Sequence, residues 1–408
     1  MKINEFFRFR LSFGKQLIRL HHTNALFFLF LTVTGFFLFS TVFRSSFPEL
    51  RVWVKESHIW VGFFSCLPVL FYVPKARKHL HALRKKKPNR MNVYIVAAIL
   101  ITFIGSGLVL TFHRQFPPVV NTWSLFLHDA ATWLGVPYVI FHSVTRSKWF
   151  KRLTAKAPQK KEIGAPVVID EKQPLYKRRT VLKMIGSTAI VLAFLPAVIK
   201  WVNPSFSLNG STKPDGNRLS PLPTPDAKSA PPIGGGRRGD FRYYTVTEIP
   251  QITNDNFQFR IDGLVDRKAS YRWEEFVALS RSVQVSDFHC VTGWSVYDVT
   301  WEGIPLKTFL EQAGVQSKAN YVKFYSADGV YTDTLSIEQA LMSDMLVAVL
   351  IDGELITQQN GGPVRLITPK MYAYKSVKWL NRIELIEKEH IGYWEQRGYD
   401  KDAWVKSL

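Results

Sequence analysis

The chain has 408 residues, enough for two or three domains, and it carries a formal net charge of +21 with 47% hydrophobic residues. A basic chain of this kind indicates nucleic acid or an anionic membrane surface as a partner. The basic residues flank long uncharged runs and do not interleave with aromatic residues, so a lipid bilayer is expected and nucleic acid is not. Cys66 and Cys290 lie in different segments, which argues against a disulfide.

Five uncharged runs predict membrane spans, at residues 25–43, 59–73, 91–112, 130–144 and 184–199. A span needs about 20 residues. The first and third runs meet this length alone, whereas the other three need flanking polar residues, and a buried soluble helix is the alternative for them. We predict an all-α four-helix transmembrane bundle over residues 1–150 and a fifth span within residues 177–202.

The loops 75–90 and 146–161 are strongly basic, and the positive-inside rule places such loops in the cytoplasm. Residues 151–176 are then a cytoplasmic linker, and the fifth span runs outward. The sequence therefore predicts a multi-pass cell-membrane protein whose last third is extracytoplasmic. Residues 177–183 look like a twin-arginine export signal, although an ordinary basic flank of the fifth span is the alternative.

Four histidines lie near the ends of predicted spans, where ligand-capable side chains are functional candidates. His21 and His142 are expected at the inner ends of the first and fourth spans, and His58 and His128 at the outer ends of the second and fourth. On an ideal α-helix, the fourteen residues from His128 to His142 place both on one face, about 21 Å apart. The pairs His21/His142 and His58/His128 can each bind a haem b between helices. Interfacial histidines without haem are the alternative.

This pattern resembles the di-haem membrane cytochrome b subunits of formate dehydrogenases and nickel hydrogenases. The resemblance rests on Arg19, His21 and Asn24, on the pair Thr34-Gly35, and on His58 followed by a glycine four residues later. It implies that His21 rather than its neighbour His22 is a ligand. It also implies two haem b groups and electron exchange with the membrane quinone pool.

Residues 203–240 are rich in Pro, Gly, Ser and Lys, which predicts a flexible extracytoplasmic tether. An α+β mixed domain is expected over residues 241–408, with turns at Asp328-Gly329 and Asp352-Gly353. The expected strands are 241–246, 257–261, 282–285, 298–301, 321–325, 346–351, 364–368 and 383–387, and the expected helices are 273–279, 306–313 and 337–342.

Cys290 follows the expected strand 282–285 and lies at a strand end beside a loop, where a side chain can face a ligand. A thiol in this position can bind a soft metal, attack as a nucleophile, or be buried as a small apolar group.

The segments 288–295, 301–306, 359–366 and 372–379 resemble the molybdopterin domain of the sulfite oxidase family. The resemblance implies that family's mixed fold, a Mo-molybdopterin cofactor, and Cys290 as the thiolate ligand of molybdenum. It places Tyr331 near the metal, where it would orient substrate or relay a proton. The other residues that it implies in cofactor binding are Ser326, Asn360, Arg365, Ser376, Val377 and Lys378.

The arginine cluster with which sulfite oxidases hold their anion is not evident in the sequence, and the uncharged Val291 follows Cys290. We therefore predict a membrane-anchored molybdopterin-dependent oxidoreductase whose small-molecule substrate is an S-oxide or N-oxide, similar to periplasmic methionine sulfoxide reductase systems. Electrons would pass between quinone and the outer domain through the two haems. The alternatives are sulfite-type oxidation with electrons passed inward, and an electron-transfer cytochrome with a non-catalytic outer domain.

Overall fold

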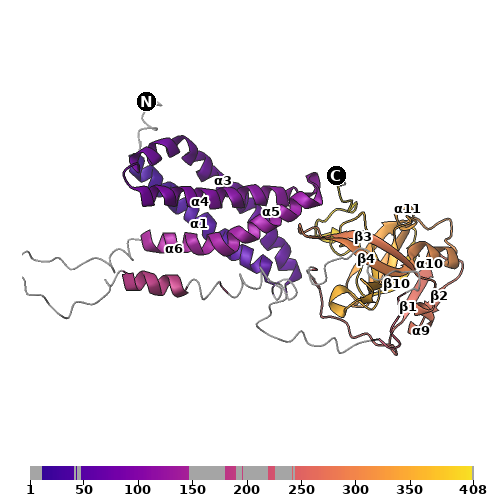
Figure 1. The fold of residues 1–408 in the computed structure, drawn as a ribbon. Coiled ribbons are helices and arrows are strands. Elements are labelled where there is room, and N and C mark those ends of the chain that lie inside the picture. Colours follow the sequence, from indigo (N-terminus) through magenta and orange to yellow (C-terminus); the bar gives the residue numbers. More distant parts are fainter. Residues whose placement is uncertain are drawn as a thin grey trace, which may run out of the picture. The chain divides into compact units, whose positions relative to one another are not determined.

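A computed structural model describes residues 12–40, 43, 47–146, 180–189, 195, 219–225, 241 and 244–406 (Figure 1). The chain forms two compact units, of which one holds the greater part of the helices and the other holds all described strands. The predicted cytoplasmic linker, the arginine pair of the export-like motif and most of the fifth span lie outside the described residues. Residues 180–189, where the fifth span is expected to begin, are helical.

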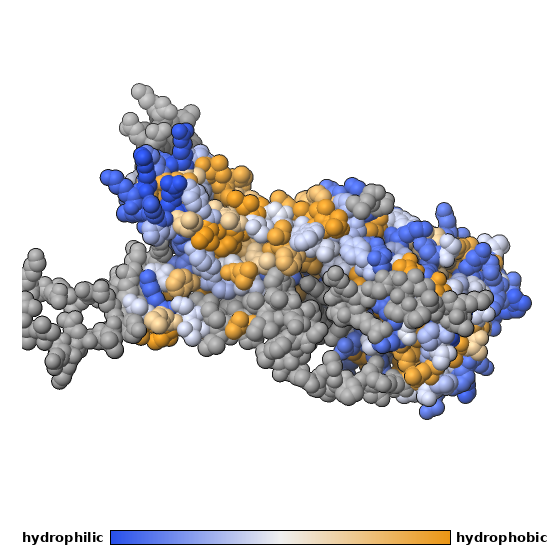
Figure 2. Space-filling view, viewed as in Figure 1, coloured by the Kyte–Doolittle hydropathy of each residue, from blue (hydrophilic) through white to orange (hydrophobic). Residues whose placement is uncertain are grey.

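Three long apolar helices make up most of the N-terminal part: α1 (Phe13–Phe39), α3 (Pro48–Ala82) and α4 (Lys87–Thr111). Each is long and apolar enough to cross a membrane. Hydrophobic surface lies over these helices in Figure 2, and Leu26, Trp53 and Ile101 are 69%, 75% and 65% exposed. Apolar surface of this extent needs a lipid environment or a partner. The second predicted span is thus part of a much longer helix, because the polar residues on both sides of 59–73 continue it.

The fourth predicted span is helical through three consecutive elements: α5 (Pro118–Ala130), a π-helical segment (Ala131–Gly135) and α6 (Val136–Arg146). Both flanking residues of the π segment, Ala130 and Val136, have right-handed helical dihedral angles, so the helix continues. The expectation of an uninterrupted α-helix between His128 and His142 was wrong, because the π segment widens one turn between them.

The C-terminal domain contains two mixed-order sheets (Figure 1). The first has the order β2-β1-β10-β5-β6, with β1 and β10 parallel and the other pairs antiparallel. Its strands are β1 (Phe259–Gly263), β2 (Ala269–Tyr271), β5 (Tyr321–Ser326), β6 (Thr332–Ser336) and β10 (Leu380–Ile386). The second is antiparallel, with the order β3-β4-β7-β8 and β9 also paired to β7. Its strands are β3 (Ser282–His289), β4 (Ser295–Pro305), β7 (Leu346–Ile351), β8 (Glu354–Leu355) and β9 (Arg365–Ile367).

Short helices connect these strands: α9 (Trp273–Val277), α10 (Leu306–Ala313) and α11 (Ile337–Ala340), with 3-10 turns at Gln358–Asn360 and Glu395–Arg397. The predicted mixed α/β character of the domain is confirmed. The loop Asp352-Gly353 joins β7 to β8 with both residues at positive φ (49° and 77°), as a two-residue hairpin turn requires. A buried cluster that includes Phe259, Trp273 and Phe309 packs the first sheet against α9 and α10.

Two expectations for this part of the chain need correction. The strand expected at 241–246 is absent from its described residues, 241 and 244–246, and β2, β6 and β8 were not predicted. Residues 219–225 of the expected tether pack on the domain: Leu219 is buried, and the Trp273 indole donates a hydrogen bond to the carbonyl of Pro221 (3.0 Å). The rest of residues 203–240 lies outside the described residues.

Candidate active site

Cys290 is the first residue of the hairpin loop that joins β3 to β4. The pair His289–Ser295 closes the hairpin, and the Cys290 N–H donates to the carbonyl of Trp294 (2.9 Å). Gly293 has a φ of 96°, a left-handed conformation that glycine adopts without steric cost. The thiol is partly exposed and lies 3.1 Å from the hydroxyl oxygen of Thr292. The hairpin therefore fixes the backbone of Cys290 while leaving its sulfur accessible.

Cys290 lines a cavity whose wall is formed mainly by the C-terminal domain, with Arg51 of α3. The structure brings most of the predicted site residues to the wall of this cavity: Cys290, Ser326, Tyr331, Asn360, Arg365, Ser376 and Lys378. They come from loops and strand ends that are far apart in the sequence, and the fold brings them together. Val377 does not line the cavity, because its side chain is 1% exposed in the hydrophobic core.

Arg365, at the start of β9, is the most unusual charge of the site. Its side chain is buried (3% exposed) and its guanidinium lies over the rings of Phe288 (4.9 Å) and Trp301 (5.8 Å). It donates to the backbone carbonyls of Asn360 (2.5 Å) and Ser376 (3.2 Å), while its Nε has no partner among the described residues. Burial lowers the pKa of Arg365 to about 9. A buried guanidinium that forms no ion pair with a described carboxylate is suited to an anionic ligand.

Lys378 is a second cation at the same wall. Its Nζ donates to the carbonyls of Tyr244 (2.7 Å) and Gln359 (3.3 Å), and burial, together with the nearby Arg365, lowers its pKa to about 7. Gly361 has a φ of 97°, and a Cβ added there would come within 2.5 Å of Lys378. The glycine thus lets the loop approach the lysine side chain closely. A partly exposed thiol beside one buried and one half-buried cation fits an anionic cofactor that carries a soft metal.

Tyr331 follows the turn after β5 and donates its hydroxyl hydrogen to the carbonyl of Tyr374 (2.5 Å). Burial, with Asp333 and Glu395 nearby, raises the pKa of Tyr331 well above its ordinary value, so this phenol stays protonated. Ser326 is buried at the end of β5, where its hydroxyl accepts a weak hydrogen bond from the N–H of Asp328 (3.3 Å).

Much of the aromatic lining of the cavity was not predicted; it includes Phe241, Tyr244, Tyr374, Trp379, Trp394 and Tyr399. Two signals for it were available: the aromatic residues of the molybdopterin-like segment 372–379 and those of residues 393–399, after the last strand. His289, which flanks Cys290, does not line the cavity. Its ring is buried, with Nδ1 at 2.8 Å from the Ser295 hydroxyl. The other flanking residue, Trp294, lines the cavity.

The predicted haem ligands lie on helices and have polar or aromatic neighbours. The rings of His21 and His142 are 5.9 Å apart, and His142 Nδ1 is 2.9 Å from the Asn92 side-chain oxygen. The ring of His128 packs against Phe103 at 5.2 Å. Asn92 and Phe103 are eleven residues apart on α4, about three turns, so both histidines meet one face of α4.

His58 Nδ1 is 2.8 Å from the hydroxyl of Thr34 on α1. A Cβ added at Gly35 would lie 3.6 Å from the His58 ring, so the pair Thr34-Gly35 contacts this histidine directly. His58 and His128 belong to different units, and their pairing stays a prediction. Within the described residues, no group of three or more His, Cys, Asp or Glu side chains could hold a metal ion.

Comparison with known proteins identifies both parts of the chain. Residues 246–394 match the model of the oxidoreductase molybdopterin-binding domain, and residues 12–199 match that of prokaryotic cytochrome b561. The uncharacterized oxidoreductase YuiH of Bacillus subtilis is 36% identical over 168 residues, which cover 41% of this chain and 81% of YuiH.

Two further relatives carry more specific names. YedZ1 of Azospira oryzae, provisionally assigned as a protein-methionine-sulfoxide reductase subunit, is 32% identical over 39% of this chain and 60% of its own length. The protein-methionine-sulfoxide reductase catalytic subunit MsrP of Ralstonia nicotianae is 27% identical over 34% of this chain and 46% of its own length. The chain thus spans about half of these two relatives. It belongs to the molybdopterin-binding oxidoreductases, and it joins their catalytic domain to a cytochrome b561-type membrane part in one polypeptide.

Proposed function

We propose that this oxidoreductase reduces a neutral S-oxide, with electrons that reach the catalytic domain from the membrane quinone pool. The observation that carries the proposal is the charge of the cavity around Cys290. Three cationic side chains line it: Arg365 and Lys378, which are both assigned here to the cofactor, and Arg51 of α3, whose guanidinium lies over the rings of Tyr244 (5.4 Å) and Trp394 (5.1 Å). Arg51 is held by two aromatic rings, so each cation among the described lining residues already has a role, and a neutral sulfoxide needs no further one.

The names of the relatives support the same substrate class, since one is a catalytic subunit and another a provisionally assigned subunit of protein-methionine-sulfoxide reductases. Reduction of a sulfoxide consumes two electrons and two protons and yields a sulfide and water. A chain that carries a cytochrome-type membrane part and the catalytic domain can receive those electrons without a separate soluble donor.

In this proposal, Cys290 holds molybdenum through its thiolate, while Arg365, Lys378 and Asn360 hold the anionic part of the pterin. When bound, Mo-molybdopterin supplies two-electron oxygen-atom transfer. The Tyr331 phenol stays protonated, and its one hydrogen is donated to the Tyr374 carbonyl, so it would donate to a substrate oxygen only by exchanging that acceptor for the substrate. Ser326 and Ser376 complete the polar wall.

We further propose that the helical part holds two b haems, one bound by His21 and His142 and one by His58 and His128. The His21 and His142 ring centroids are 5.9 Å apart with the rings at 70° to each other, which supports the first pair, because two imidazoles this close on neighbouring helices can be the two axial ligands of one haem. Asn92 and Thr34 hold the Nδ1 atoms of His142 and His58, which directs the Nε2 atom to the metal. The fourth helix and a fifth span would complete the membrane part, with the catalytic domain outside the cytoplasm.

The experiment uses the purified full-length chain. Elemental analysis and a haem spectrum are expected to give one molybdenum and two b haems per chain. Reduced haems should be reoxidised by a dialkyl sulfoxide and not by buffer alone. Reoxidation only by an unrelated acceptor, or haem reduction on addition of sulfite, would contradict the proposed substrate and direction. Haem without molybdenum would instead support an electron-transfer cytochrome.

A further inference from the structure

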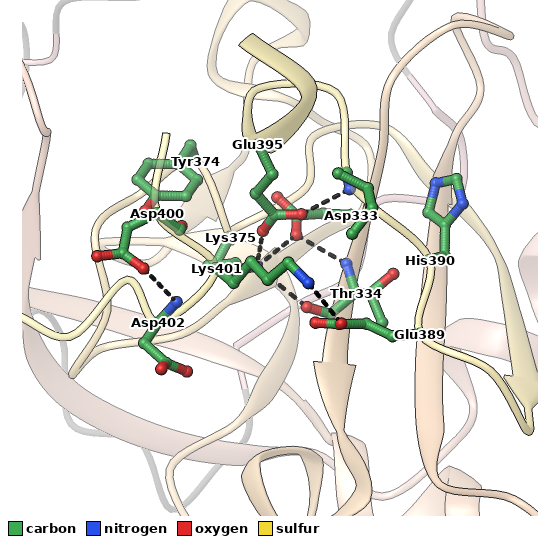
Figure 3. Close-up of polar contacts among 12 residues, drawn as sticks. Asp333, Thr334, Tyr374, Lys375, Glu389, His390, Glu395, Asp400, Lys401 and Asp402 are labelled. Carbon is green, nitrogen blue, oxygen red and sulfur yellow. Dashed lines mark hydrogen bonds and ion pairs between the residues drawn. The ribbon is translucent and has the colours of Figure 1, made fainter. Parts of the chain in front are cut away.

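A buried ion cluster lies in the C-terminal domain and contributes no lining to the cavity. Figure 3 shows its members, Lys375, Asp333 and Glu395, whose side chains are 3%, 1% and 3% exposed. Asp333 belongs to β6, Lys375 precedes β10, and Glu395 begins the last 3-10 turn. Removing charges from water costs several kcal/mol per ion. None of these three residues has a role in the proposed chemistry, so the burial of their charges is to be explained in another way.

The ammonium of Lys375 is fully hydrogen-bonded. Its Nζ donates to Asp333 Oδ1 (2.9 Å), to the Thr334 carbonyl (3.1 Å) and to Glu395 Oε1. Glu395 Oε2 accepts from the Gly392 N–H (2.5 Å), which fixes the carboxylate from the other side. The Oδ2 atom of Asp333 is buried without a partner among the described residues. Two carboxyl groups thus face a single cation, and the cluster is neutral only when the carboxyl pair holds a proton.

The wall segment, residues 373–378, extends on both sides of Lys375. Toward the N-terminus, the Ala373 N–H donates to the carbonyl of His289 (2.8 Å). His289 immediately precedes Cys290, so this bond ties the wall segment to the backbone of the predicted metal ligand.

The neighbours of Lys375 in the wall segment hold two further residues of the cavity. The Tyr374 carbonyl accepts the hydroxyl hydrogen of Tyr331 (2.5 Å), and the Ser376 carbonyl accepts from Arg365 (3.2 Å). Both carbonyls flank the one residue whose side chain points into the ion cluster. A shift of Lys375 would therefore move the acceptors of both Tyr331 and Arg365.

We propose that Lys375, Asp333 and Glu395 form a positioning cluster, which fixes the wall segment and, through it, the hydroxyl of Tyr331. Lys375 does not touch the cavity, so it acts through the backbone on either side of it. The inference rests on the proposed function only in taking the cavity as the place where substrate is reduced.

The charge of the cluster gives the proposal a pH signature. Burial raises the pKa of Asp333 to about 7, with Glu395 adding to the rise and Lys375 opposing it. Because this value lies above the ordinary 3.8, the folded protein retains the proton, and the stability that the cluster contributes is lost as pH rises through about 7. The groups that face Asp333 are Lys375, Glu395 and Tyr331, and His390 hydrogen-bonds the preceding Thr332 (2.8 Å).

The test compares Lys375→Met and Asp333→Asn with Lys401→Met in the holoenzyme. Lys401 forms a solvent-exposed ion pair with Glu389 (2.6 Å) near the cluster (Figure 3), so it is a matched control. We expect Lys375→Met to raise the KM for a dialkyl sulfoxide at least tenfold and to change the paramagnetic resonance spectrum of the metal centre. Lys401→Met should change neither.

Asp333→Asn removes the titrating carboxyl while leaving Lys375 paired with Glu395. It should match the wild type at pH 6.5 and keep its KM constant up to pH 8.5, where the wild-type KM rises. A Lys375→Met variant with the KM and the spectrum of the wild type would overturn the proposal. So would an Asp333→Asn variant whose KM rises with pH as that of the wild type does. If Lys375→Met does not fold, Asp333→Asn decides. If the wild type reduces no sulfoxide, the proposed substrate class is wrong. The positioning role of the cluster is then tested by the paramagnetic resonance spectrum alone.

Discussion

Replacing Arg365 by methionine separates a cofactor-binding role from a role in folding. In the protein without pterin, the buried charge is costly: a fall of its pKa from 12.5 to about 9 corresponds to roughly 5 kcal/mol at about 1.36 kcal/mol per pKa unit. The ring contacts with Phe288 and Trp301 offset about 1 kcal/mol each. The two hydrogen bonds to backbone carbonyls offset about 1.5–2 kcal/mol each.

These opposing contributions nearly cancel, and methionine fills the apolar part of the arginine site without a charge. We therefore expect the free energy of unfolding of the pterin-free Arg365→Met variant to stay within about 2 kcal/mol of the wild type. Cofactor binding should behave differently, because two charge-assisted hydrogen bonds to a phosphate are worth about 3–6 kcal/mol together. Their loss weakens retention by about 10²–10⁴-fold.

The assay measures molybdenum per haem after gel filtration and thermal unfolding of protein made in a host that lacks molybdopterin. Arg382→Met is the matched control, since Arg382 pairs with Asp262 (2.8 Å) on the first sheet and does not line the cavity. We expect the control to keep its molybdenum and Arg365→Met to lose it. A normal molybdenum content in Arg365→Met would refute the reasoning. So would loss of molybdenum accompanied by a large drop in the pterin-free unfolding temperature.

Three further predictions concern single contacts. Cys290→Ser should abolish sulfoxide reduction while leaving the haem spectrum unchanged, and activity above a few per cent would exclude Cys290 as the metal ligand. Asn92→Leu should weaken haem retention by about 10- to 100-fold and shift a haem potential, because His142 loses its Nδ1 partner, whereas Thr102→Val on the same helix should do neither. Molybdenum retention in the wild type should fall as pH rises from 6 to 8.5, because the half-buried Lys378, whose pKa is about 7, loses its charge. Lys378→Arg should retain the metal across this range, and equal losses in both proteins would contradict the role of this charge.

The apolar runs and the loop motifs were predictable from sequence because their information is local. Residues 13–111 contain long uncharged stretches that only lipid or a protein core can accept, and these became α1, α3 and α4. The hairpin position of Cys290 followed from the strand pattern on both sides of it. The π segment at 131–135 was not predicted, and it ends at Gly135, where an added Cβ would lie 2.9 Å from the side chain of Ile99 on α4.

The sequence alone determined the two-part nature of this oxidoreductase and the identity of about half of the polar residues of its cavity. Hydropathy and motif spacing are properties of residues that are close in the sequence, so they can be read without knowledge of the fold. Only the tertiary structure decided that Val377 is a core residue, that Arg365 is buried without a carboxylate partner, and that Lys375 joins Asp333 and Glu395 behind the wall segment. Contacts between residues 20 to 42 positions apart depend on how strands and loops meet, and no local pattern encodes them.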